Sequence, residues 1–219
     1  MSITKSHQSA PDQVVLHTLR CIGTASADRV ASACGLPPDE VAQRLGALSD
    51  RGLVTLFPGP FGGWELTDLG RTTVQESVAA ELAIADARDD VHGLYESFLT
   101  LNSVLLEVCS DWQMWKVGST RVLNDHSDRN HDAGVLSRLI RIDEAAQQIC
   151  GDLAGCLQRF SVYSSRLSFA LERAVAGDDA YVADNLDSYH TVWFQLHEDL
   201  LVTLGISRDD ERQGKPGSG

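Results

Sequence analysis

Apolar residues spaced three or four positions apart mark three short helices near the beginning of the chain. The spacing predicts helices over residues 11–22, 26–34 and 37–51. Ser26 is a residue type that caps helix N-termini, and Gly35 suits the left-handed position that follows a helix. The third helix is expected to bury one stripe of side chains, formed by Val41, Leu45 and Leu48.

A different pattern follows, in which two short apolar runs flank a turn. Residues 53–56 and 64–66 are predicted to be strands, because the segment between them, residues 57–63, contains five Gly or Pro. Thr67 is suited to cap the next helix. The order of helix, helix, turn, helix and two-stranded ribbon is that of a winged helix-turn-helix domain.

A heptad pattern dominates the second half of the chain. Apolar residues alternate at spacings of three and four over more than three heptads, which predicts one long helix over residues 86–116. We expect this stripe to pack inside a helical bundle rather than in a free coiled coil. The stripe consists of Val91, Leu94, Phe98, Leu101, Leu105, Val108, Trp112 and Trp115.

Further amphipathic segments follow a polar stretch, residues 118–132, that is expected to be a loop. The periodicity predicts helices over residues 135–153, 167–175 and 182–204, followed by a disordered tail over residues 209–219. Four amphipathic helices with short connections indicate an antiparallel bundle.

These elements divide the chain into two domains of different charge. The sequence predicts a mainly α protein, with a winged helix-turn-helix domain over residues 1–80 and an antiparallel helical bundle over residues 81–208. The net charge is −13; residues 1–80 carry 6 Lys and Arg against 8 Asp and Glu, and the remainder carries 12 against 23. Nucleic-acid binders are usually basic, so the near-neutral first domain permits DNA binding without arguing for it.

Composition favours a cytoplasmic location. No apolar run approaches the ~20 residues that a membrane span needs, and the first residues lack the apolar core of a signal peptide. The five cysteines are odd in number and include no Cys-x-x-Cys pair, which favours small buried thiols over a zinc or redox motif.

Two motifs resemble a known family. The pattern Gly35-Leu36-(x)4-Val41-(x)3-Leu45-(x)2-Leu48-(x)2-Arg51-Gly52-Leu53-Val54 is similar to the recognition-helix signature of MarR-like transcription regulators. The run Trp64-Glu65-Leu66-Thr67-Asp68-Leu69-Gly70-Arg71 resembles the segment in which that family leaves the wing. The resemblance covers about residues 14–79 and implies a winged helix whose third helix enters the major groove of DNA.

The resemblance also places the residues that would face DNA. Gln43 is suited to read an adenine edge and Arg44 a guanine or a phosphate, whereas Asp39 would repel phosphate. The tip of the predicted wing contains no Lys or Arg, so use of the winged helix for protein contacts or dimer packing remains an open alternative. The candidate DNA-binding residues are Pro38, Asp39, Gln43, Arg44, Ala47 and Arg51.

A second candidate site lies in the predicted bundle. His190 and His197 share a helix face that adjoins Tyr189 and Trp193, and the polar loop over residues 124–128 offers partners for them. We predict a pocket for a small polar or anionic effector. Two alternatives are a divalent metal site that uses His126, His190 and His197 with a carboxylate, and a purely structural role. The candidate effector-binding residues are Trp112, Asn124, His126, Asp128, Tyr189, His190, Trp193 and His197.

Parts of the second half resemble a helical module of actinobacterial proteins that occurs alone or appended to enzymes of the pyruvate phosphate dikinase type. The similar segments are residues 99–102, 111–113, 124–128 and 188–201. The resemblance implies a link to phosphoenolpyruvate or pyruvate metabolism, although the phosphate loop and phosphohistidine motif of the dikinases are absent from this sequence.

Together these features predict a homodimeric transcription regulator that binds a double-stranded DNA operator and responds to a small-molecule effector, with no cofactor and no membrane contact. The alternative is a metabolite-sensing or protein-interaction adaptor, linked to phosphoenolpyruvate or pyruvate enzymes, whose winged helix does not bind DNA. No catalytic motif is present, so we do not expect an enzyme. A weaker third hypothesis assigns acid–base chemistry to His190 or His197.

Overall fold

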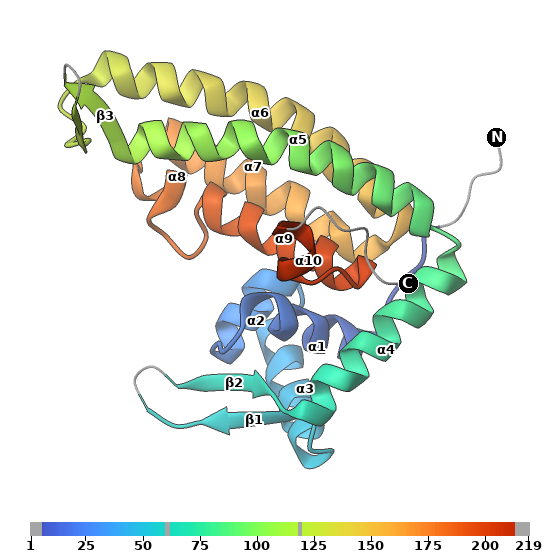
Figure 1. Ribbon diagram of the computed structural model, residues 1–219. Helices are drawn as coiled ribbons and strands as arrows, with labels where there is room; N and C mark the ends of the chain where they lie inside the picture. Colours follow the sequence, from blue (N-terminus) through green and yellow to red (C-terminus); the bar gives the residue numbers. More distant parts are fainter. Residues whose placement is uncertain (1–5, 60–61, 118–119, 213–219) are drawn as a thin grey trace.

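The computed structural model of the chain describes residues 6–59, 62–117 and 120–212 (Figure 1). Within these residues the protein is mainly helical, as predicted, with ten α-helices, one 3-10 turn and two separate two-stranded hairpins. None of the described helices combines the length and the apolar composition that crossing a membrane requires.

The N-terminal part of the chain, up to residue 80, contains three short helices, a hairpin and most of a longer helix. The antiparallel hairpin pairs Val54 with Leu66 and Phe57 with Gly63. Figure 1 shows the hairpin extending to one side, while the longer helix runs from this part toward the rest of the chain. The elements are α1 (Pro11–Ile22), α2 (Ala27–Cys34), α3 (Pro38–Asp50), β1 (Val54–Phe57), β2 (Gly63–Leu66) and α4 (Asp68–Ala85).

Local signals fix the ends of α2 and α4, as the sequence predicted. The Ser26 side chain accepts a hydrogen bond from the Arg29 amide at the start of α2, and Gly35 ends that helix with a φ of 72°. The Thr67 side chain caps α4 by accepting from the amide of Gly70. The predicted stripe of α3 is buried, and Val41, Leu45 and Leu48 each have an exposed fraction of 0%.

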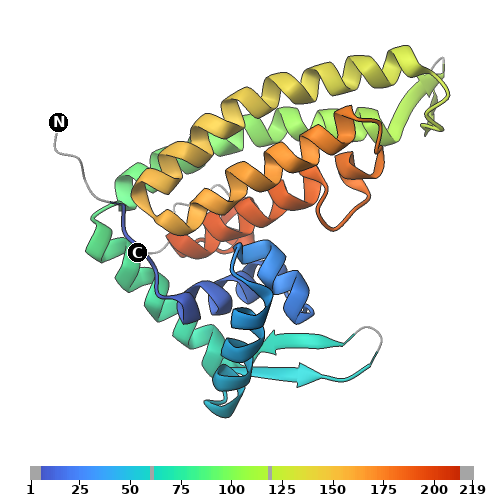
Figure 2. The ribbon, with the colours of Figure 1, turned by 180° about the vertical axis from the view of Figure 1, so that it is seen from behind.

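The C-terminal part is built from two long helices and two shorter ones beside them. Figures 1 and 2 show the two long helices lying side by side, with α7 and α9 between them and the N-terminal part. A small hairpin connects the long helices at one end. The elements are α5 (Arg88–Gln113), β3 (Met114–Val117), β4 (Thr120–Leu123), α6 (Arg129–Cys156), η1 (Gln158–Phe160), α7 (Ser161–Val175), α8 (Ala180–Ala183), α9 (Tyr189–Leu204) and α10 (Arg208–Arg212).

The heptad stripe of α5 forms a large share of the second core. Five of its members are buried, two more pack against the core while partly exposed, and Trp115 lies beyond the helix in β3. The stripe therefore marks the buried face of α5, as predicted. The five buried members are Val91, Phe98, Leu105, Val108 and Trp112.

Several sequence predictions for this part were wrong in detail. The predicted helix over residues 86–116 ends at Gln113, and β3 begins at Met114. The predicted loop over residues 118–132 contains β4 and the first turn of α6, whose cap is Asp128. All four residues of β4 are exposed, so the strand carries no alternation between core and solvent that a pattern could reveal.

The predicted helix over residues 182–204 is two helices, α8 and α9. Val182 belongs to α8, the side chain of Leu186 between the helices is 69% exposed, and Ser188 caps α9 by accepting from the amide of Thr191. The predicted disordered tail begins inside α10, because Arg208–Arg212 is helical. The rest of that tail, residues 213–219, lies outside the described residues.

The described residues form two separate hydrophobic cores, and α4 contributes side chains to both. Val74 and Val78 belong to the core of the N-terminal part, whereas Leu82, one turn further along α4, belongs to the core of the C-terminal part. The predicted boundary near residue 80 thus falls at the change of core inside a continuous helix. A helix shared in this way ties the orientation of one part to that of the other.

Candidate functional site

The predicted DNA-binding residues lie together on one solvent-facing side of α3. Pro38, Asp39, Gln43 and Ala47 are exposed, as is Arg51 directly after the helix. Arg44, the sixth candidate, is half-buried at its side chain. Five of the six candidates are therefore open to solvent, and Arg44 is partly covered.

Both arginines of this surface are held by carboxylates of the same chain. The Arg44 Nη1 atom lies 2.7 Å from Asp12 Oδ1, and its Nη2 lies 2.8 Å from Glu40 Oε1. Arg51 Nη1 lies 3.1 Å from the other oxygen of Asp12. Asp12, in the first turn of α1, therefore bridges the two cations that the sequence assigned to DNA.

The β1–β2 hairpin projects beside α3 (Figure 1), and the first residues of β2 are bonded to the segment before α2. The amide of Trp64 donates to the Ala25 carbonyl at 2.7 Å, and the Ala25 amide donates back at 3.0 Å. A Cβ at Gly63 would lie 2.7 Å from the Ala25 carbonyl carbon, so this approach requires glycine. Leu56 and Phe57 of β1 are exposed, and the tip residues 60–61 are outside the described part of the chain.

A buried ion cluster joins the N-terminal and C-terminal parts. We use this name for His17 of α1, Glu81 of α4, Arg159 of η1 and Asp199 of α9, whose side chains are all at least nine-tenths buried. Arg159 Nε donates to Glu81 Oε2 at 2.9 Å, and its Nη1 donates to Asp199 Oδ1. A guanidinium between two carboxylates is the arrangement that makes such deep burial of charge tolerable.

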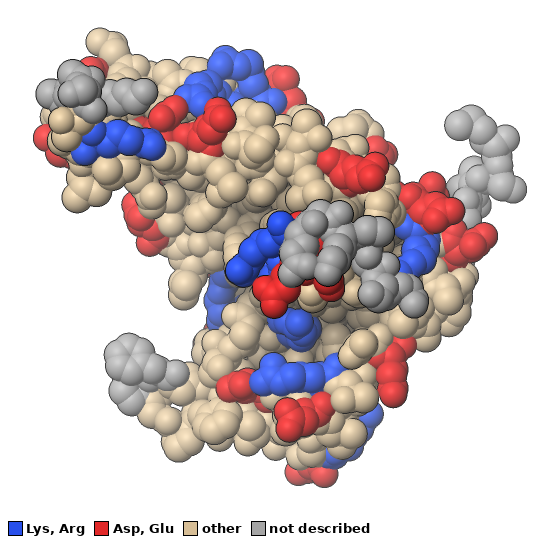
Figure 3. Space-filling model, in the orientation of Figure 1, with Lys and Arg blue, Asp and Glu red and all other residues tan. Residues whose placement is uncertain are grey.

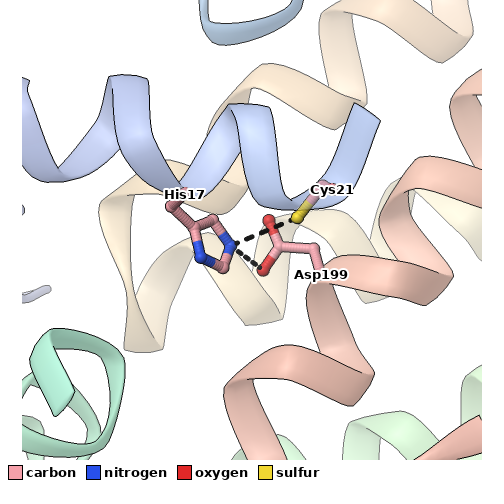
Figure 4. A group of neighbouring side chains, drawn as sticks. All are labelled: His17, Cys21 and Asp199. Carbon is pink, nitrogen blue, oxygen red and sulfur yellow. Dashed lines mark hydrogen bonds and ion pairs between the residues drawn. The ribbon is translucent and has the colours of Figure 1, made fainter. Parts of the chain in front are cut away.

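The cluster continues through Asp199. Its Oδ1 lies 2.9 Å from Nε2 of His17, and its Oδ2 accepts from the Tyr163 hydroxyl at 2.9 Å. Figure 4 shows His17 and Cys21 pointing from α1 toward Asp199 on α9. Burial raises the pKa of the Asp199 carboxyl, but Arg159 and His17 outweigh it and hold the pKa well below its ordinary value.

His17, Cys21 and Asp199 also form the one group among the described residues with three ligand atoms close enough to share a metal ion. They do not fit a metal, because the cation Arg159 already bonds to two of them: its Nη1 lies 3.0 Å from His17 Nε2 and donates to Asp199. Burial, with Asp199 adding to it, raises the pKa of the Cys21 thiol and opposes the thiolate that a metal would require.

A cavity of about 180 Å³ adjoins the ion cluster between α1 and α2 on one side and η1 and α7 on the other. Its walls combine apolar side chains such as Val14 and Val162 with the polar groups of His17, Tyr163 and Arg166. Arg166 Nη2 donates to Gln195 Oε1 at 2.6 Å. Because residues of both parts line the cavity, we call it the interdomain pocket.

The predicted effector-binding residues do not form a single pocket. Trp112, Asn124, His126 and Asp128 lie at the hairpin end of α5 and α6. The Asn124 Nδ2 atom donates to Trp112 O and to Asp132 Oδ1, both at 2.9 Å, and Nδ1 of His126 lies 3.2 Å from the same Asp132 oxygen. These side chains bond to one another at the hairpin end of α5 and α6. The Asp128 side chain caps the N-terminus of α6.

The other predicted effector residues lie along α9. His190, Trp193 and His197 line one open groove with Leu99 and Leu106 of α5, while Tyr189 is buried and donates to Asp143 Oδ1 at 3.0 Å. Trp193 donates to Asn102 Oδ1 at 2.9 Å, and His197 Nε2 lies 2.6 Å from Glu211 Oε1. Burial lowers the pKa of His197, and Glu211 works against that shift.

The alternative of a metal held by His126, His190 and His197 finds no geometric support. Among the residues that the structure describes, these histidines do not belong to a group of three or more metal-ligating side chains. His126 and His197 instead pair with separate carboxylates, Asp132 and Glu211. The buried ion cluster, in contrast, was not predicted from the sequence.

Comparison with known proteins adds no relative: no family model, no curated protein and no solved structure matches this chain. The functional interpretation therefore depends on the geometry of the chain itself.

Proposed function

We propose that the protein is a transcription regulator whose N-terminal part is a winged helix-turn-helix domain and whose C-terminal part is a helical bundle that dimerises and senses an effector. The open surface of α3 is the observation that carries this proposal. The projecting hairpin beside α3 supports it, because a winged helix presents both elements to DNA. We expect a cytoplasmic homodimer that reads two half-sites of an operator with a pair of α3 helices.

Replacing Gln43 by Glu tests whether this surface reads DNA. We expect Gln43→Glu to weaken binding of the full chain to the DNA upstream of its own gene by about tenfold or more, because a carboxylate cannot donate to an adenine edge. Fluorescence anisotropy at low and moderate salt measures the effect. Gln113→Glu, an exposed residue at the end of α5, is the control with the same change in charge.

If the two variants lose the same amount of affinity for DNA, the cause is general charge repulsion. That result would argue against base reading by α3. Failure of the unmodified chain to bind any duplex at low salt would end the proposal and leave the adaptor alternative. The specific observation that favours the adaptor is the pairing of Arg44 and Arg51 with Asp12.

For the effector, the interdomain pocket is better supported than the groove on α9. The pocket is lined by α1 and α2 as well as by α7, so a bound molecule would contact both parts and favour one arrangement of them. Nδ1 of the buried His17, a lining residue, has no hydrogen-bond partner among the described residues. A volume of about 180 Å³ suits a molecule of roughly one ring, since a cavity of about 150 Å³ holds benzene.

Filling the pocket tests this assignment. We expect benzoate, used as a one-ring anionic probe for Arg166 and His17, to raise the melting temperature of the unmodified chain, because a ligand that binds only the folded state stabilises it. Val162→Phe, which places a ring in the pocket, is expected to abolish the shift. Val175→Phe, the same change at an exposed position of α7, is expected to retain it. An identical shift in both variants would place benzoate elsewhere.

A further inference from the structure

A second hollow between the two parts of the chain is rich in arginine. It has a volume of about 400 Å³ and lies between α1 and α4 on one side and the end of α9 on the other. We call it the arginine groove. Figure 3 shows Lys and Arg side chains gathered at the junction of the two parts on this face. The lining residues are Arg20, Arg71, Val74, Gln75, Glu198, Leu201, Val202, Gly205, Ile206, Ser207 and Arg208.

The charge of the arginine groove is opposite to that of the whole protein. Three arginines and one carboxylate line it, although the chain has a net charge of −13. Arg20 and Arg71 come from the N-terminal part and Arg208 from the C-terminal part. Glu65 pairs with Arg71, and Glu198 and Glu211 pair with Arg208. Arg20 is therefore the cation of the groove that no described carboxylate neutralises, and it favours an anionic ligand.

The three guanidinium groups differ in how firmly they are held. Arg20 is exposed and forms no ion pair or side-chain hydrogen bond with a described residue. Arg71 pairs with Glu65 at 2.9 Å across an exposed surface, where such a pair contributes little and is readily exchanged. Arg208 pairs with both Glu198 and Glu211 and lies 5.1 Å above the Phe194 ring, which fixes its position.

We propose that the arginine groove binds a small phosphorylated molecule. The planar guanidinium forks of Arg20 and Arg71 match phosphate oxygens. Arg208 lies on the opposite wall, where Glu198 and Glu211 offset its charge. Apolar side chains such as Val74 and Leu201 offer a surface for the organic portion of the ligand. The groove is a hollow between two parts of the chain, so it suits a small molecule better than a rigid duplex.

The inference is independent of DNA binding by α3, and so is its test. We expect calorimetry to detect binding of pyrophosphate to the full chain at constant ionic strength. Arg20→Gln should weaken that binding by about tenfold or more, because it removes a charge-assisted hydrogen bond without disturbing an existing partner. Arg141→Gln, at an exposed position of α6 outside the groove, is the control and should leave the affinity within about twofold.

Three outcomes would overturn the proposal. Absence of heat with pyrophosphate means that the groove is not a phosphate site. Equal weakening by Arg20→Gln and Arg141→Gln means that the probe responds only to the general charge of the protein. Loss of DNA binding but not of pyrophosphate binding in Arg20→Gln would assign Arg20 to a nucleic-acid surface instead.

Discussion

Replacing Asp199 by Asn is expected to lower the free energy of unfolding by about 3–5 kcal/mol, since it removes one partner from a buried charge pair. Arg159 would keep Glu81 alone as a counter-charge, and His17 and Tyr163 would lose an acceptor that carries a full charge. Urea unfolding followed by circular dichroism measures the change. Asp209→Asn, in which the original side chain is 83% exposed, is the control and should have almost no effect.

The acid dependence of stability provides a second measure of the same contact. The folded-state pKa of Asp199 is lower than its unfolded value, so the unfolded chain binds its proton first as the pH falls. The contribution of Asp199 is therefore present above about pH 4 and is lost below it. Asp199→Asn should flatten this part of the curve. An unchanged acid dependence, or a loss below about 1 kcal/mol, would show that the ion cluster does not hold the two parts together.

Local signals in the sequence predicted helix ends in the N-terminal part. Ser26, Gly35 and Thr67 act within a few residues of their own position, so their caps follow from residue type and spacing. The hairpin over residues 114–123 carries no comparable signal, because its second strand is exposed throughout. Patterns of burial predict an element only where one of its faces packs against a core.

The buried ion cluster was not predicted, because its members lie far apart in the sequence. His17 and Arg159 are 142 residues apart, and nothing in the sequence states which helices bring them together. One signal was present: Asp199 lies between Leu196 and Leu200 on the apolar stripe of α9, where a carboxylate must find a partner. His190 and His197 lie on the opposite face of α9, and the sequence of α1 contains no motif that identifies the partner of His17.

The exposure of α3 would allow DNA contact, but the carboxylates beside it oppose phosphate binding. Position and exposure agree with DNA contact, but Asp12 and Glu40 satisfy the cations that would bind phosphate. A duplex would have to displace these carboxylates before Arg44 and Arg51 could reach its backbone. On the proposed function, we expect the unmodified chain to bind DNA with low affinity, and we expect Asp12 to be the main cause.

Replacing Asp12 by Asn is therefore expected to strengthen DNA binding by about tenfold, because it releases Arg44 Nη1 and Arg51 and removes a charge that repels phosphate. Each additional phosphate contact steepens the dependence of log affinity on log salt by about 0.9. Arg51 is released fully, whereas Arg44 is still held by Glu40, so the slope should steepen by about 1. Anisotropy titrations at several salt concentrations measure both quantities.

Asp28→Asn separates the release of the arginines from the general loss of a negative charge. Asp28 is also an exposed carboxylate in the first turn of an N-terminal helix, but it forms no ion pair with a described residue. It should raise the affinity only slightly and leave the salt dependence unchanged. If Asp28→Asn equals Asp12→Asn in both respects, Arg44 and Arg51 do not contact DNA. If neither variant binds DNA at any salt concentration, the adaptor alternative explains the exposed surface of α3 better.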